Sequence, residues 1–468
     1  MNSIFASRPL ARAIRLGAVA AAVVAVAACD KILDVNNPGA LEAPKLNNPT
    51  YIDLMANGVV GEFQQMTHWD WIYAAKFSGE VTNHHVYFEE GDIGRRDIGD
   101  PSSNGTYQLA VYNPLHRVRW LADSVTSRIK ALEGDSAGRD LRLARVLAYA
   151  GYSYVYIGEQ LCASPINTGP LKTSDEILAM APPRFDEAIK VAAAAKTWAL
   201  GQPSNAAMQR YIAGADSITN FARVGAARAS LDLNKKAEAI AYASAVTPAW
   251  TSDASAATRG FQFWAPFLDA SVNNRWWQVA AQASGGGSRE VGLDGTMFDG
   301  ISDPRVPQQR LTVSDGTNGG GTPPGVNVPK SSEAFSTYDG TLVGAEITKS
   351  AALRLASAIE ARYILAEAQG KNAANIDFVN NRRAVAGMAP LPPTVDDVTY
   401  RNALIEQRAR ELFLDGHRLG DIRRYKKNYG LDFYLHGPYP ASSTLQYGSL
   451  ECFPLTLSEV QGNPNLGS

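Results

Sequence analysis

Apolar residues recur every three or four positions along much of the first half of the chain, which predicts a series of amphipathic helices. The pattern starts at residue 52 and returns at 109–132, 141–157 and, in an alanine-rich form, 184–198. Residues 218–246 show two more helices, separated by a polar break at 232–234. These segments predict a mainly α-helical first block, residues 51–246.

The helical period disappears after residue 250. Glycine-rich low-complexity segments at 285–287 and 316–325 predict loops. Helical spacing returns at 351–369, 375–385 and 398–414, and the tail from 431 to 468 has no period. We therefore expect one domain, residues 51–468, in which helical blocks 51–246 and 351–425 flank a loop-rich block at 250–350.

Small residues in the first block are spaced as in the helix pairs of tetratricopeptide repeats. One copy is made by Phe221, Val224, Gly225, Ala237 and Ala241, with Gly225 and Ala237 as the close-packing positions. A second copy pairs Gly151 with Ala188, but 37 residues separate them instead of 12, so an insertion must loop out between the two helices. A generic helical hairpin is the alternative reading.

The N-terminus has the order of charges of a secretory signal. Arg8, Arg12 and Arg15 precede a short apolar stretch at 17–28, and Cys29 follows two alanines directly. This junction resembles the lipobox of bacterial lipoproteins, in which the cysteine is diacylated, and two acyl chains give stable anchoring. We expect a signal peptide at 1–28, lipidation at Cys29 and an extended tether at 29–50. An ordinary signal peptide followed by a buried cysteine is the alternative.

The net charge argues against one class of partner, and the two remaining cysteines could form a disulfide. The net charge is −2, with no basic excess, which argues against a nucleic-acid partner. Beyond the signal there is no second apolar run that could span a bilayer. In an oxidising compartment, Cys162 and Cys452 could form one disulfide or remain two buried thiols.

The motifs that would indicate catalysis or a cofactor are weak. Residues 134–138 match G-x-S-x-G, but a helix precedes them where a nucleophile elbow needs a strand. The adjacent His84 and His85 have no third metal ligand at suitable spacing. We predict neither catalysis nor a cofactor nor a metal, although 46 acidic residues leave a glycosidase carboxylate pair open.

The most specific pattern lies near the C-terminus. Residues 407–424, QRARELFLDGHRLGDIRR, resemble the E-R-x-x-E-L-x-x-E-G-x-R-x-x-D-L-x-R signature of the SusD/RagB family of nutrient-binding outer-membrane lipoproteins. Gln407 replaces the usual glutamate and Gly420 the usual aromatic residue. Residues 303–305 (DPR), 362–368 (RYILAEA), 380–388 (NNRRAVAGM) and 453–465 (FPLTLSEVQGNPN) are similar to further family segments, in the same order.

The residues of this signature are expected to hold the fold together and not to bind a ligand. Glu411 and Asp415 would lie one turn apart on a helix that Gly416 ends. Arg–carboxylate pairs would then fix the exit of the chain, because a lone buried charge is costly. The residues expected to do this are Arg408, Glu411, Asp415, Gly416, Arg418 and Asp421.

The family resemblance implies a tetratricopeptide-like α superhelix that binds glycans at the cell surface and delivers them to a SusC-like TonB-dependent outer-membrane transporter. A sugar site uses flat aromatic rings beside polar groups. One candidate set is Trp69, Trp71, Tyr73, Asn83, His84, Tyr87 and Arg95, and the second is Trp264, Trp276 and Trp277. Each of these aromatic residues could instead belong to the core.

Other functions stay open from the sequence. A lipoprotein glycoside hydrolase, a repeat scaffold that binds only proteins, and a carrier of peptides would all fit. Asp30 after the lipidation site is an inner-membrane signal in some bacteria, which leaves the choice of membrane open as well.

Overall fold

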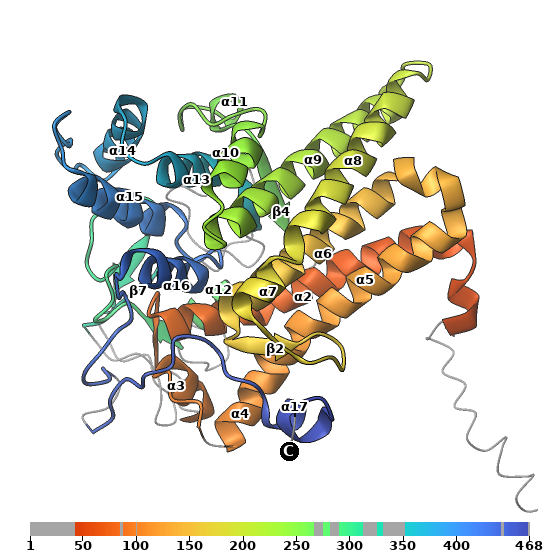
Figure 1. Ribbon diagram of the computed structural model, residues 1–468. Coiled ribbons are helices and arrows are strands. Elements are labelled where there is room, and N and C mark those ends of the chain that lie inside the picture. The colour runs from red at the N-terminus through yellow and green to blue at the C-terminus, as the bar shows by residue number, and fades with distance from the viewer. Residues whose placement is uncertain are drawn as a thin grey trace, which may run out of the picture. The chain divides into compact units, whose positions relative to one another are not determined.

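A computed structural model describes residues 43–84, 88–99, 101–265, 275–280, 290–311, 325–330, 352–440 and 444–466 (Figure 1). The predicted signal peptide, the lipidation candidate Cys29, His85 and the site candidate Tyr87 lie outside these residues. The chain divides into two compact units, Met1–Tyr51 and Ile52–Ser468. In the first unit, the described residues form two short 3₁₀ helices, η1 (Ala43–Leu46) and η2 (Pro49–Tyr51).

The second unit is built mainly from helices, as the sequence predicts (Figure 1). In its first half the long helices are α2 (Ile52–Ser78), α5 (Asn113–Glu133), α6 (Leu141–Gln160), α8 (Ala181–Leu200), α9 (Ala206–Asp232) and α10 (Lys236–Ser244). Those in its second half are α13 (Ala358–Gln369), α14 (Ala373–Val385), α15 (Asp397–Glu411) and α16 (Arg418–Tyr429). No helix in the described ranges has the length and apolarity that crossing a membrane requires.

Shorter helices connect these elements. They are α3 (Phe88–Gly94), α4 (Pro101–Tyr107), the π-helix η3 (Gln108–Tyr112), η4 (Gly134–Arg139), α7 (Ser174–Leu178), α11 (Ala256–Arg259), α12 (Arg275–Ala280) and α17 (Leu457–Gly462). The G-x-S-x-G match lies in η4, a turn between helices α5 and α6, where Ser136 Oγ donates to the Glu133 carbonyl at 2.6 Å. That segment is therefore a connection and not a nucleophile elbow.

Two glycines allow helices α6, α8 and α9 to pack closely. Gly151 of α6 and Gly225 of α9 both lie against the buried ring of Phe185 on α8. A Cβ atom at Gly151 would stand 2.6 Å from the nearest ring atom, and one at Gly225 would be closer still. The prediction that Gly151 and Gly225 are close-packing positions is confirmed.

The matching prediction for Ala237 is wrong. Ala237 is exposed, whereas Ala239 and Ala243 of α10 are buried. Helix α10 begins only at Lys236, so Ala237 lies in its first turn, on the solvent side. The buried face of α10 is shifted by two residues from the repeat spacing.

The insertion expected between Gly151 and Ala188 contains a small hairpin. Strands β2 (Ala163–Pro165) and β3 (Leu171–Thr173) pair antiparallel, and Thr173 then caps α7 through a reciprocal hydrogen-bonded box with Glu176. Cys162, just before β2, forms a disulfide with Cys452 of the C-terminal tail. Backbone hydrogen bonds from Cys162 N–H to Phe453 O (2.9 Å) and from Phe453 N–H to Gln160 O (2.8 Å) align the same two segments.

The middle of the chain supplies short antiparallel strand pairs. In the described residues these are β1 (Thr82–Asn83) with β5 (Val291–Gly292), β4 (Gln262–Ala265) with β8 (Leu353–Ser357), and β6 (Gln308–Arg310) with β7 (Asn327–Pro329). The helix predicted from residue 351 is therefore wrong at its start, because Leu353–Ser357 is a strand. Helix α13 begins at Ala358, where Ser357 Oγ accepts from Glu360 N–H.

Gly225→Ala should destabilise the fold because the new methyl group would overlap the Phe185 ring, and overpacking of this kind costs about 1–3 kcal/mol. Gly61→Ala on α2 is the matched control, since no heavy atom lies within 4 Å of its Cβ position and alanine favours a helix by up to about 1 kcal/mol. Urea unfolding followed by circular dichroism measures both. Equal stability of Gly225→Ala and the wild type would contradict this packing.

Candidate functional site

Residues of the first candidate set meet where α2 ends. Trp69 and Tyr73 lie in the last turns of α2, and the chain then reverses through Gly79, with φ +70°, into strand β1. β1 carries Asn83 and pairs antiparallel with β5, with Thr82 opposite Gly292. The pairing brings the loop-rich block against the end of a long helix.

His84 is held by the carboxylate of Asp294, which no sequence pattern singles out. Its Nε2 atom lies 2.8 Å from Asp294 Oδ1, and Thr82 Oγ1 donates to the same oxygen at 2.6 Å. Although burial raises the pKa of Asp294, hydrogen bonds from His84 and Thr82 lower it below the ordinary value. His84 is thus a buried member of a polar cluster, and among the described residues no group of three potential ligands could hold a metal ion.

Trp69 is the half-buried aromatic ring of this region. Its ring is nearly parallel to that of Tyr73, with centroids 6.4 Å apart, and the Arg275 guanidinium lies 4.4 Å from the Trp69 centroid. Tyr73 Oη donates to Glu90 Oε1 at 3.1 Å, and Lys76 Nζ donates to the other oxygen of Glu90 at 2.5 Å. We call the half-buried Trp69 ring, with the buried Tyr73 ring and the Arg275 guanidinium beside it, the Trp69 platform.

The remaining candidates differ in accessibility. Trp71 has no exposed surface and packs against Gly416 and the ring of Tyr156, so a sugar could not reach it and it is a core residue. Asn83 and Tyr73 are also buried. Arg95 is partly exposed and forms ion pairs with Asp92 and Asp97.

The second set does not stay together as one patch. Trp276 and Trp277 lie on α12, which packs on α2 and β5 beside the first set, and both are almost fully buried. Trp264 is half-buried on β4, opposite Arg354 of β8. Helix α12 therefore contributes Arg275 to the platform, while its two tryptophans pack inside.

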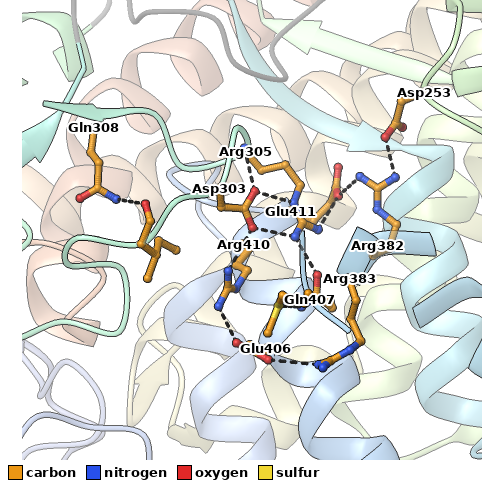
Figure 2. A network of polar contacts seen from close by, with 12 residues as sticks. Asp253, Asp303, Arg305, Gln308, Arg382, Arg383, Glu406, Gln407, Arg410 and Glu411 are labelled. Atoms are coloured by element: carbon orange, nitrogen blue, oxygen red, sulfur yellow. Dashed lines mark hydrogen bonds and ion pairs between the residues drawn. The ribbon is translucent and has the colours of Figure 1, made fainter. Parts of the chain in front are cut away.

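Figure 2 shows a network of polar contacts around the buried carboxylates Glu411 and Asp303. Glu411 Oε2 is shared by Arg382 at 2.7 Å and Arg305 at 3.4 Å, and Asp303 is shared by Arg305 and Arg410. Arg305 also donates to Gln407 Oε1 at 2.7 Å. Burial raises the pKa of Asp303, but its partners Arg305 and Arg410 hold it below the ordinary value. The network joins the loop at 303–305 to α14 and α15.

A second part of the network surrounds α16. Asp421 accepts from Arg408 at 2.8 Å and pairs with Arg424 at 2.9 Å, and Arg424 also binds Glu367 and Asp232. These side chains come from α9, α13, α15 and α16 and are nearly inaccessible to solvent. The scaffold role expected for Arg408, Glu411 and Asp421 agrees with this geometry.

Two details of the expected scaffold are wrong. Helix α15 ends at Glu411 and not at Gly416, so Asp415 lies in a turn, where it pairs with Arg354 and His417. The turn closes because the buried Glu80 carboxylate accepts Leu414 N–H at 2.9 Å, and Leu414 has φ +63°. Arg418 lies near the rings of Phe298 and Phe433, and no ion pair of Arg418 is seen within the described ranges.

Comparisons with known proteins identify the fold. No protein-family model matches the chain, and no curated protein matches by sequence. A SusD superfamily protein from Bacteroides vulgatus is similar in structure, with a TM-score of 0.59 and 14% identity over 89% of this chain and 97% of that one. A SusD/RagB family protein from Bacteroides thetaiotaomicron gives 0.54 and 16% over 88% and 94%.

A third similar structure is a SusD-like carbohydrate-binding protein from Bacteroides fragilis, with a TM-score of 0.53 and 14% identity over 81% of this chain and 86% of that one. At these identities the comparisons establish the fold. The fold implied by the resemblance to the SusD/RagB family is confirmed, because the chain has the mainly helical fold of SusD-like proteins.

Arg382→Met should lower the free energy of unfolding by about 3–5 kcal/mol, because it leaves Glu411 and Asp253 without their shared buried partner. Arg383→Met is the control next to it in sequence. Arg383 is more exposed and lies 3.8 Å from Glu406, so its loss should cost less than about 1 kcal/mol. Denaturant titration compares the two, and equal effects would contradict the network's structural role.

Stability should fall as the pH rises from 6 to 9. Burial raises the pKa of Asp70 to about 7 and that of Glu80 to about 8. Burial and the Arg228 charge lower the pKa of His417, but Glu360 and Asp415 outweigh them and raise it to about 9. The folded protein therefore keeps protons that the unfolded chain has already released, and deprotonation favours unfolding. Calorimetry should show a falling Tm over this range, less steep in Glu80→Gln, whereas a rising Tm would contradict the assignment.

Proposed function

We propose that the protein is a lipid-anchored binding protein of the outer-membrane surface that captures glycans without transforming them and passes them to a SusC-like TonB-dependent transporter. The observation that carries the proposal is the half-buried Trp69 ring, held beside Tyr73 and Arg275 in a SusD-like fold. Apolar C–H faces of a sugar ring pack on such a ring, while charged neighbours bind its hydroxyl groups. The similar structure from Bacteroides fragilis, described as carbohydrate-binding, supports the same ligand class.

The acids near the platform favour binding over hydrolysis. Glu90 is bonded to Lys76 and Tyr73, Asp92 pairs with Arg95, and Asp294 is bonded to His84 and Thr82. A glycosidase needs one carboxyl group that holds a proton for the leaving group and a second that attacks or activates water. Carboxylates that already accept from cations and hydroxyl groups are better suited to orient a ligand.

Anchoring and delivery belong to the same proposal. A diacylated Cys29 and the tether at 29–50 would hold residues 51–468 at the membrane as one domain, and the transporter would receive the ligand there. The predicted signal at 1–28 and the family resemblance support this arrangement. A peptide carrier is the second candidate, because charged groups border the same platform.

Trp69→Ala should abolish retardation of the protein on native gels that contain the polysaccharide which retards the wild type, chosen from a panel of polysaccharides. Loss of the stacking ring should weaken binding by about tenfold or more. Trp198→Ala is the control, since Trp198 is exposed on α8 and lies outside the platform. Unchanged retardation of Trp69→Ala would rule out this platform, and release of reducing ends by the wild type would favour the hydrolase.

A further inference from the structure

The turn that joins α8 to α9 carries an exposed segment without a charge. Figure 1 shows this turn projecting at the upper right, past the ends of α5 and α6. Residues 197–209, TWALGQPSNAAMQ, contain no aspartate, glutamate, lysine or arginine, although these four types make up 19% of the chain. We call this segment the α8–α9 tip. Apart from Ala199 and Met208, every residue of the tip is exposed.

The tip presents two large apolar side chains on an ordered turn. Leu200 is 64% exposed and Trp198 is 39% exposed. The Trp198 ring packs edge-on against Tyr211, with centroids 5.9 Å apart, and Asn205 Oδ1 accepts from two backbone N–H groups in the first turn of α9. A single exposed apolar residue is ordinary on a protein surface, whereas apolar residues gathered on one projecting surface indicate a binding face.

Basic residues border the tip on both sides. Lys196 directly precedes it and pairs with Asp216 at 2.7 Å, while Arg210 directly follows it, is exposed and has no ion pair within the described ranges. Tyr211 Oη donates to the Arg139 carbonyl at 3.4 Å, which places the exposed Arg139 of η4 beside the start of α9. At the boundary of a bilayer, tryptophan lies at the level of the headgroups and cations meet the lipid phosphates, and the tip and its border have this chemistry.

Most acids at this end of the helices are paired. Arg142, in the first turn of α6, pairs with Asp53, Glu133 and Asp140. The exposed Asp135 of η4 has no ion pair in the part of the chain that the structure describes, so it offsets one of the positive charges. Because Asp53 lies in the first turn of α2, the pair with Arg142 also places the start of α2 at the same end as the tip.

The start of α2 is where the anchored segment enters the domain. Only Tyr51 separates the predicted tether at 29–50 from α2. A fully extended tether of this length would reach about 70–80 Å, so an acylated Cys29 alone would leave the orientation of the domain open. A second membrane contact at the end where the tether enters would restrict that orientation.

We propose that the α8–α9 tip inserts into the interfacial region of the lipid bilayer that holds the anchor. The inference rests on the proposed anchoring through Cys29. The Trp198 and Leu200 side chains then lie among the upper parts of the acyl chains, and Arg139 and Arg210 reach the phosphate groups. Lipid suits the tip because the headgroup region accepts the indole N–H as well as the ring and requires no complementary protein surface.

A fluorescent label on the tip tests the proposal in the exported, acylated protein, reconstituted into vesicles of phosphatidylcholine and phosphatidylglycerol. Leu200→Cys supplies one reactive thiol, because acylation blocks Cys29 and Cys162 is bonded to Cys452. The emission of a nitrobenzoxadiazole label there should shift to shorter wavelength and be quenched by lipids with a doxyl group on the acyl chain. Leu457→Cys, exposed on α17, is the matched control and should show neither effect.

The outcomes separate the tip from the anchor. If the protein floats with the vesicles but the label at position 200 behaves like the label at position 457, insertion of the tip is overturned and the anchor stands. A shift that appears only after a second protein is added would assign the tip to that protein and also overturn the proposal. Failure of the protein to float would contradict the lipid anchor, and insertion of the tip with it.

Trp198→Asp should reduce the quenching of the label at position 200, because a charge would then have to enter the interface. Trp120→Asp is the matched control, since Trp120 is 56% exposed on α5, and it should leave the quenching unchanged. Both substitutions change exposed side chains, so circular dichroism should show the wild-type fold in each. Equal quenching in the two variants would overturn the assignment of Trp198 to the bilayer.

Discussion

The structure depends above all on guanidinium groups buried between helices that are distant in the sequence. Arg424 alone connects α16 to α9 and α13, and Arg382 connects α14 to α15 and to Asp253. Removing such charges from water is expensive, and Arg382 and Arg424 are buried together with the carboxylates that pair with them. The helices that supply the partners are thereby held in one relative arrangement, because any other would leave a charge buried and unpaired.

Helix α2 connects the ion-paired helices to the Trp69 platform. Trp71 packs under Gly416, and Glu80 receives the Leu414 amide from the same turn between α15 and α16. Trp69 and Tyr73, on the same helical turns as Trp71, are therefore positioned by the ion-paired half of the molecule. The position of the Trp69 ring is therefore set by the packed helices, whereas Arg275 beside it comes from the loop-rich block.

Most helices were predictable from the sequence because apolar spacing and polar breaks act locally. Their boundaries were less so: α9 begins at Ala206 and not at 218, and α13 begins at Ala358 and not at 351. The close-packing role of Gly151 and Gly225 was predictable because helices that pack closely need small residues at fixed positions in the repeat. The strand at Leu353–Ser357 was missed because its apolar residues continue directly into those of α13. The division of the chain into a signal, a tether and one domain remains a prediction.

The candidate site was less predictable for a physical reason. The spacing of apolar residues shows which residues share a helix. It does not show which side chain from a distant part of the sequence lies beside them in the fold. No local pattern marks the partners found in the structure. Asp294 is bonded to His84, Arg275 lies over the Trp69 ring, and Glu80 accepts a hydrogen bond from Leu414. Trp71 and Trp69 are two positions apart on α2 and look equivalent in the sequence, yet one faces the core and the other faces outward.

The bond between Cys162 and Cys452 spans 290 residues, which sets an order of events during biosynthesis. A ribosome delivers Cys162 long before Cys452, so the covalent ring can close only after residue 452 has been made. Until then Cys162 is a free thiol at the end of α6, open to mixed disulfides with other molecules. A mixed disulfide formed early at Cys162 would have to be exchanged before Cys162 could bond to Cys452.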